Sequence, residues 1–99
     1  MPRPLALTAQ EIDDWLASSP GWTLDGAALV RQATASSFSD AIRWVVEVAD
    51  AAESADHHPD IDIRWRTLTF RLSTHDAGAI TTLDIALARE IDAVVGDSS

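Results

Sequence analysis

Two of the three histidines in the chain are adjacent, His57 and His58, and Pro59 follows them directly. An unperturbed imidazole titrates near pH ~6.5, so a histidine can both give and take a proton at neutral pH. Proline disfavours helix in the residue before it, which predicts that His58 is extended. Glu53 stands four residues before His57, so the two share a helix face if the preceding helix runs that far. The pattern predicts a proton-transfer site where that helix ends.

The third histidine, His75, closes a strand-like segment and precedes a helix start. Catalytic groups are commonly found in loops at the ends of elements, so three histidines at element boundaries favour a shared site. Spacing alone leaves two alternatives open: the adjacent histidines form an ordinary polar loop, or all three bind a metal. The chain has no Cys and no HExxH spacing, so we expect no metal.

The composition of the 99-residue chain predicts one domain over residues 1–99, with loose ends at 1–7 and 96–99. Hydrophobic residues make up 46% of the chain, enough for the core of a small domain. Asp and Glu outnumber Lys and Arg by 16 to 7, and the formal net charge of -9 opposes binding to nucleic acid or anionic membranes. With no apolar stretch long enough for a bilayer and no signal-peptide pattern, we expect a soluble cytoplasmic protein.

Three segments have hydrophobic residues at helical spacing, at about 9–18, 38–55 and 82–95. The first begins with Thr8 and has Glu11 three residues later, the form of a capping box. The third begins in the same way with Thr81 and Asp84, and Gly96 ends it.

Four shorter segments alternate between apolar and polar residues or are rich in strand formers, and they form two hairpins. The first hairpin joins 22–24 to 27–33 through Asp25-Gly26, and the second has its turn near Arg66-Thr67. We predict that one set of the second hairpin faces the helices, namely Ile61, Ile63, Trp65, Leu68, Phe70 and Leu72. The opposite set, predicted to face away, is Asp62, Arg64, Thr69 and Arg71.

The element order is therefore α-β-β-α-β-β-α. Hairpins imply antiparallel pairing, and one apolar face on each strand implies helices on one side only. We predict an α+β two-layer sandwich, in which three helices cover one face of a four-stranded antiparallel sheet.

Three motifs of the chain resemble those of the pterin-4a-carbinolamine dehydratases. They are Glu53-x-x-Asp56-His57-His58-Pro59, Leu72-Ser73-Thr74-His75-Asp76-Ala77-Gly78 and Thr81-x-x-Asp84, and Gly21-Trp22 and Phe38 also fit. The resemblance covers residues from about 8 to 95. Two positions depart from the family pattern: Ile61 stands where animal members commonly have Trp, and Gly78-Ala79-Ile80 replaces the usual Gly-Gly-Leu or Ala-Gly-Leu.

The resemblance implies an enzyme that dehydrates 4a-hydroxytetrahydropterin to quinonoid dihydropterin, within the recycling of tetrahydrobiopterin-type cofactors. It implies a small-molecule pterin substrate, no cofactor, and a homodimer or homotetramer. The implied catalytic residues are His57, His58, His75 and Asp84, and the implied substrate-binding residues are Glu53, Asp56, Pro59, Ser73, Thr74 and Asp76. Of the histidines, His57 and His75 are implied to move protons and His58 to orient the pterin.

Several of these residues also fit ordinary structural roles. Asp84 fits a helix cap, Glu53 a solvated helix position, and Ser73 and Thr74 plain strand positions. For the whole chain, the alternatives are a family member that has lost catalysis and serves in binding or assembly, and a module that pairs through exposed sheet edges. The presence of all three histidines favours the enzyme.

The charge of the chain generates a first prediction, on nucleic acid. With a formal net charge of -9 and no cluster of Lys or Arg, the protein should show no salt-sensitive retention on duplex DNA at physiological ionic strength. Retention on a DNA column that weakens as salt is raised would contradict this expectation.

Overall fold

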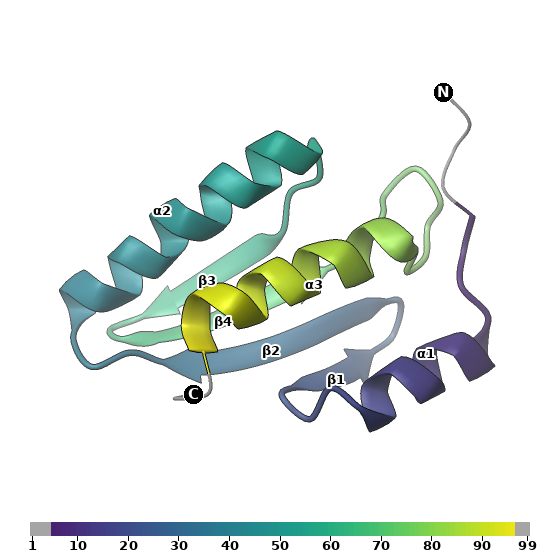
Figure 1. Ribbon diagram of the computed structural model, residues 1–99, viewed down its shortest axis with the longest axis horizontal. Coiled ribbons are helices and arrows are strands. Elements are labelled where there is room, and N and C mark those ends of the chain that lie inside the picture. The colour runs from purple at the N-terminus through teal and green to yellow at the C-terminus, as the bar shows by residue number, and fades with distance from the viewer. Residues whose placement is uncertain (1–4, 97–99) are drawn as a thin grey trace.

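The computed structural model describes residues 5–96 and consists of three helices on one side of an antiparallel sheet (Figure 1). The helices are α1 (Ala9–Ala17), α2 (Phe38–Ala55) and α3 (Thr82–Val95). The strands are β1 (Trp22–Asp25), β2 (Ala28–Thr34), β3 (Asp60–Arg64) and β4 (Thr67–Leu72), in the sheet order β1-β2-β4-β3. The predicted α+β fold class and element order are confirmed.

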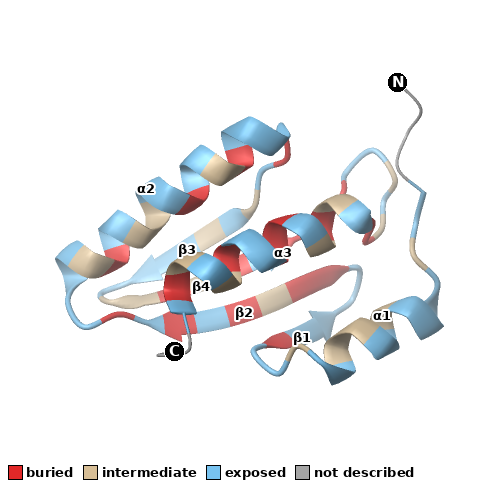
Figure 2. Ribbon diagram, viewed as in Figure 1, coloured by how far each residue is buried: buried red, intermediate tan, exposed pale blue. Residues whose placement is uncertain are grey.

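Cross-strand pairing shows which residues share a face, because directly opposed residues of antiparallel strands point the same way. Phe70 pairs with Ile61 on one side and with Arg31 on the other, and Leu68 pairs with Ile63 and Ala33. Phe70, Leu68 and Leu72 are completely buried under the helices (Figure 2). The predicted register of the second hairpin is therefore correct, although Ile63 remains 43% exposed on the edge strand β3.

Trp65 is an exception to that register, and its predicted inward position is wrong. Arg64 pairs with Thr67, so the turn consists of Trp65 and Arg66 rather than Arg66 and Thr67. Trp65 has a φ of 54° and is 71% exposed. The first residue of this two-residue turn needs a positive φ, and here a tryptophan adopts it while its ring lies against the Arg66 guanidinium, 4.8 Å from the ring centroid.

The first hairpin shows a smaller shift of the same kind. Asp25 pairs with Ala28, so Asp25 is the last residue of β1 and the turn consists of Gly26 and Ala27. Gly26 has a φ of 60°, which costs a residue without a Cβ little. The predicted turn at Asp25-Gly26 is therefore one residue early.

The helix starts follow the predicted caps. The Thr8 and Thr81 side chains accept from the third backbone amide of their helices, and Glu11 and Asp84 return a bond to each cap. The predicted loose N-terminus is wrong for Leu7, whose amide donates to the Ile80 carbonyl at 2.9 Å. Residues 1–4 and 97–99 lie outside the described part of the chain.

The core lies between the sheet and α3, with α2 beside it and α1 against the β1 end (Figure 1). Leu87, Ala88 and Ile91 of α3 are buried. Trp15 of α1 packs on Trp22 of β1, with ring centroids 6.0 Å apart. Between residues 5 and 96, no helix is both long and apolar enough to cross a membrane.

Two opposed residues on this face generate a stability prediction. Leu68 is fully buried and Ile63, its partner on β3, is partly exposed. Leu68→Ala should lower the free energy of unfolding by about 2–5 kcal/mol because it leaves a cavity. Ile63→Ala, measured by the same urea titration, should cost less than half as much, and equal losses would contradict the burial described here.

Candidate functional site

Three element ends meet at one open hollow: the end of α2, the end of β4 and the start of α3. Its volume is about 230 Å³, and its lining residues are Asp56, His57, His58, Ser73, Thr74, His75, Asp76 and Leu83. The structure thus brings together all three histidines, which are up to 18 residues apart in the chain.

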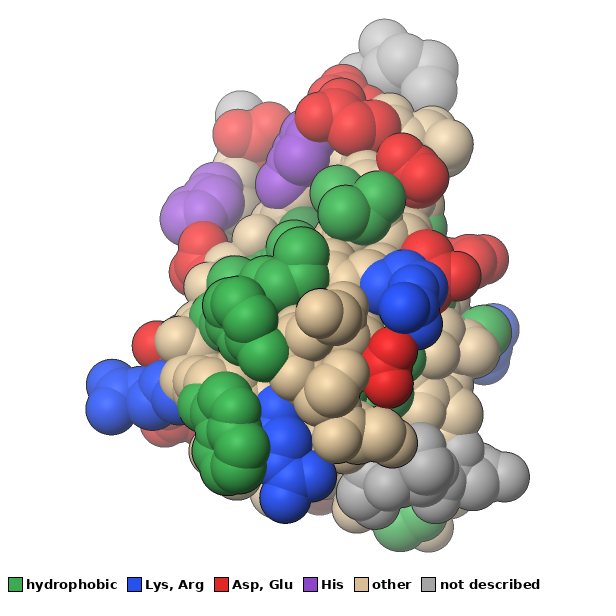
Figure 3. All heavy atoms as spheres, turned by 90° about the vertical axis from the view of Figure 1, so that its left-hand side faces the viewer, with side chains coloured by type: hydrophobic (Ala, Val, Ile, Leu, Met, Phe, Trp, Pro, Cys, Tyr) green, Lys and Arg blue, Asp and Glu red, His purple; other side chains and the backbone are tan. Residues whose placement is uncertain are grey.

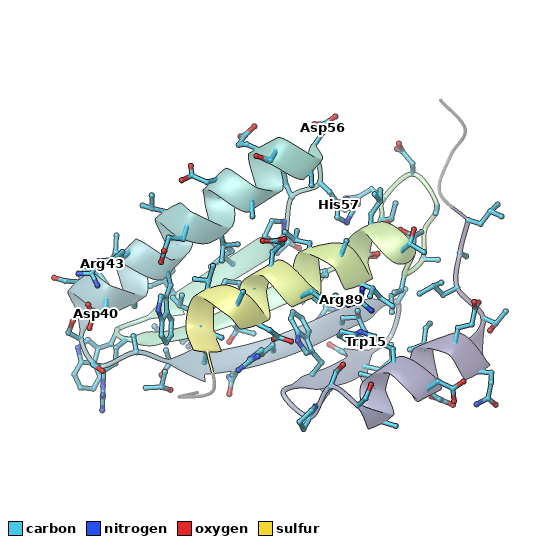
Figure 4. The ribbon with its side chains drawn as sticks, in the orientation of Figure 1. Trp15, Asp40, Arg43, Asp56, His57 and Arg89 are labelled. Carbon is cyan, nitrogen blue, oxygen red and sulfur yellow. The ribbon has the colours of Figure 1, made fainter. Side chains whose placement is uncertain are left out.

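The end of α2 directs two adjacent histidines differently. Asp56 adopts the left-handed conformation with a φ of 49°, and its amide and that of His57 both donate back into the last turn, to carbonyls that include that of Ala52. This tight end turns the chain so that His57 is buried while His58 stays exposed. Figure 4 shows His57 just past the end of α2, on the side of the start of α3.

Glu53 does not pair with His57, as it would if the helix continued. The helix ends at Ala55, and the Glu53 carboxylate instead lies 3.6 Å from His58 Nε2. Both side chains of this pair are largely exposed, at 78% for Glu53 and 55% for His58. Exposed ion pairs of this kind contribute little stability, so the contact serves at most to bias the orientation of His58.

The loop after β4 is closed tightly around His75. The Thr74 amide donates to the Ala79 carbonyl at 3.0 Å, and the Gly78 amide donates to the His75 carbonyl at 3.1 Å. Gly78 has a φ of 61°, the left-handed conformation that this turn requires. The loop therefore holds His75 on a short hydrogen-bonded turn at the mouth of the hollow.

Asp84, in the first turn of α3, is completely buried and is the polar centre of the site. Its Oδ2 accepts from the Thr74 hydroxyl at 2.8 Å and from the Thr81 backbone amide at 2.9 Å. Its Oδ1 lies 2.5 Å from His57 Nε2. One oxygen thus caps the helix and the other binds the histidine, so the two roles considered for Asp84 are both present.

The contact with Asp84 settles which nitrogen of His57 carries hydrogen. A carboxylate only accepts hydrogen bonds, so Nε2 must be the donor. In the neutral imidazole the lone pair is then on Nδ1, the ring nitrogen that is available to a ligand in the hollow. The buried carboxylate also stabilises positive charge on the ring whenever Nδ1 is protonated.

Two threonine hydroxyls support the carboxylate from behind. Thr74 gives its hydrogen to Asp84, so it must accept from the Thr81 hydroxyl, 2.8 Å away. The Thr81 hydroxyl in turn accepts from the Leu83 backbone amide at 3.2 Å. The resulting chain of bonds holds Asp84 in one orientation and uses the hydroxyl of Thr74, a residue singled out from sequence as a substrate contact.

The structure places the remaining predicted residues unevenly. Ser73 and Asp76 line the hollow, whereas Pro59 and Glu53 do not. Leu83 lines it as well, although its sequence pattern indicated only a core position. A second hollow of about 190 Å³ adjoins the first and includes Arg71 and Asp60, whose alternation in the strands gave no sign of a site. Among residues 5–96, no three His, Cys, Asp or Glu residues are arranged to hold a metal ion.

Comparison with known proteins agrees with this arrangement. The sequence model of the pterin 4 alpha carbinolamine dehydratase family matches residues 5–94. The chain belongs to this family. A protein from Mycobacteroides abscessus with the provisional name pterin-4-alpha-carbinolamine dehydratase is 54% identical over 90 residues, which cover 91% of this chain and 96% of that protein. A protein of the same provisional name from Nocardia farcinica is 55% identical over 86 residues, 87% of this chain and 90% of its own.

Solved structures of the family's fold are also similar. A transcriptional coactivator/pterin dehydratase from Brucella melitensis superposes with a TM-score of 0.88 at 33% identity, covering 92% of this chain and 99% of that one. A pterin dehydratase-like protein described as a RuBisCO assembly factor in the alpha-carboxysome has a TM-score of 0.63 at 19% identity, over 78% of this chain and 89% of its own. The second likeness shows the shared fold alone.

The hydroxyl chain behind Asp84 generates a prediction for Thr74. Thr74→Val keeps the shape of the side chain but removes a hydrogen bond to a buried carboxylate, which should lower the free energy of unfolding by about 1–3 kcal/mol. Thr74→Ser keeps the hydroxyl and should retain most of that stability in the same urea titration. Equal stability of the valine variant and the wild type would show that Thr74 does not support Asp84.

Proposed function

We propose that this protein is a cytoplasmic dehydratase that converts 4a-hydroxytetrahydropterin to quinonoid dihydropterin, within the recycling of a pterin cofactor. The observation that supports this most is the buried Asp84–His57 pair, which opens into a hollow that His58 and His75 also line. The chain's own side chains supply groups for acid–base chemistry, and we propose that the reaction uses no cofactor.

The proposed reaction is an elimination of water. The C4a–O bond breaks, and the leaving hydroxide takes a proton from an acid. The N5–H bond also breaks, its proton passes to a base, and its electron pair forms the C4a=N5 double bond. The enzyme therefore needs one group that gives a proton and one that takes a proton, and each cycle returns both to their starting state.

His57 and His75 are the proposed pair for these two proton transfers. His57 comes from the end of α2 and His75 from the loop after β4, so a ring in the hollow can contact them from different directions. Asp84 fixes the ring of His57 and stabilises the charge that it acquires, in the way that a buried carboxylate orients an imidazole in hydrolases. Thr74 is a positioning residue in this scheme because it acts through Asp84.

His58 is proposed to hold the pterin ring, and Glu53 to bias its imidazole toward the hollow. The polar edge of a pterin carries both donors and acceptors. Asp56, Ser73 and Asp76 line the hollow with groups that can match them, while Leu83 offers an apolar surface to the ring face. Pro59 contributes by keeping His58 extended.

The scheme predicts how each histidine affects turnover of chemically generated carbinolamine. A general acid or base contributes roughly 10²–10⁴-fold, so His57→Ala or His75→Ala should lower kcat strongly, and the double variant should lose nearly all catalysis. His58→Ala should raise KM more than it lowers kcat. Circular dichroism of each variant checks that the fold survives.

Two outcomes would count against the proposal. A folded His57→Ala/His75→Ala variant with the wild-type rate would show that other groups carry the chemistry. A wild-type protein that never dehydrates carbinolamine, yet binds a partner protein, would favour the alternative of a catalytically inactive binding or assembly module.

We also propose that copies of this chain associate into a homodimer or homotetramer. Figure 3 shows hydrophobic side chains gathered on the face where α2 starts. The exposed apolar residues of α2 and the β3–β4 hairpin are Phe38, Ile42, Val46, Ile63 and Trp65. Three of them, at positions 38, 42 and 46, recur every four residues and so lie along one side of α2.

Light scattering tests this association. The wild type should have a mass that is a multiple of the 10.7 kDa monomer. Val46→Glu should shift the mass toward the monomer because it places a charge in the apolar stripe, whereas Arg89→Glu, an exposed position on α3, should leave the mass unchanged. A monomeric wild type would contradict the proposal.

A further inference from the structure

A second hollow lies directly beside the one that contains His57. Its volume is about 190 Å³, and it shares three lining residues with the first, namely His58, Ser73 and His75. Neither hollow alone reaches the ~300–1,000 Å³ typical of small-molecule sites, but the two together do. A ring in the first hollow would therefore have room for one substituent in the second.

The walls of this second hollow come from both hairpins. Asp60 and Arg71 are direct cross-strand partners on β3 and β4, and Ala27 and Ala28 come from the turn that joins β1 to β2. The small side chains of the two alanines leave the space open. The turn between β1 and β2, which has no part in the proton transfers, thus borders the site.

Arg71 is held in place by that same turn. Its Nη1 donates to Asp25 Oδ2 at 2.7 Å, and its Nη2 donates to the Asp25 carbonyl at 3.4 Å. Two bonds to one residue restrain the guanidinium plane and leave it as a fixed donor group at the wall. Asp60, on the first residue of β3, is exposed and supplies carboxylate acceptors.

The charges of these walls select the kind of substituent. One cation, Arg71, stands with two carboxylates, Asp25 and Asp60, so the local charge is negative. A phosphate or carboxylate on the ligand would meet net repulsion here. Hydroxyl groups carry no charge, donate to a carboxylate and accept from a guanidinium, so they match both walls.

We propose that the second hollow binds the C6 substituent of the pterin and selects a short, neutral, hydroxylated chain over a methyl group or an anionic group. This inference rests on the proposed function, because it takes the ring to bind in the first hollow. It makes Asp60 and Arg71 specificity-determining residues for the side chain.

Equilibrium binding of three stable pterins tests the inference without turnover. The probes are 6-methylpterin, biopterin with its dihydroxypropyl chain, and 6-carboxypterin, each titrated while ligand fluorescence is followed. The wild type should bind biopterin about threefold to tenfold more tightly than 6-methylpterin, the effect of roughly one hydrogen bond net of water, and should bind 6-carboxypterin most weakly.

The decisive variant is Asp60→Ala, and Asp62→Ala is its matched control. Asp62 is the same residue type on the same strand and the same face, but it lines neither hollow. Asp60→Ala should bring the biopterin and 6-methylpterin dissociation constants close together and reduce the penalty against 6-carboxypterin. Asp62→Ala should keep the wild-type order.

The outcomes separate this inference from the proposed function. Carbinolamine turnover with equal affinity for biopterin and 6-methylpterin, or an unchanged preference in Asp60→Ala, overturns the side-chain site alone. The predicted preference in a protein without turnover supports the site and overturns the dehydratase. Failure to bind any of the three pterins overturns both.

Discussion

A buried carboxylate in the first turn of α3 links the fold of this protein to its candidate chemistry. Asp84 is fully buried, and an uncompensated charge in that position would cost several kcal/mol. Its three donors are supplied by the loop after α2, the loop after β4 and the start of α3 itself. Because no one of these segments satisfies Asp84 alone, the bond network that stabilises the carboxylate also requires the three segments to meet.

The sequence predicts most of the elements because their signals are local. Helical spacing and capping residues locate α2 and α3, and alternation locates the second hairpin. The local signals fail where a residue acts against its usual preference. Trp65 takes the positive φ that a glycine would usually supply, so its apolar character wrongly suggested an inward strand position. Asp56 ends α2 one turn too early for Glu53 to reach His57.

The members of the site are predictable from motifs, but their division of labour is not. The spacing of Thr81 and Asp84 indicates a cap, which uses only one carboxylate oxygen. The partner of the other oxygen is 27 residues away, and spacing carries no information about it. The same holds for Arg71, which a strand pattern assigns to the solvent face and which a bond to the distant Asp25 places beside the histidines.

α3 carries a second acidic anchor, and the contrast between the two explains why the chemistry lies at one end. Near the C-terminal end, Asp92 accepts from the buried Arg31 and from Trp22 Nε1 at 2.9 Å. A Cβ on Gly21 would stand 3.0 Å from the Arg31 guanidinium, so a side chain there would disturb the pair. Arginine remains protonated at all relevant pH values, so this pair can clamp the helix but cannot exchange a proton. At the N-terminal end the partner of the acid is an imidazole, which can, and only there does the buried ion pair offer a titratable group to a hollow.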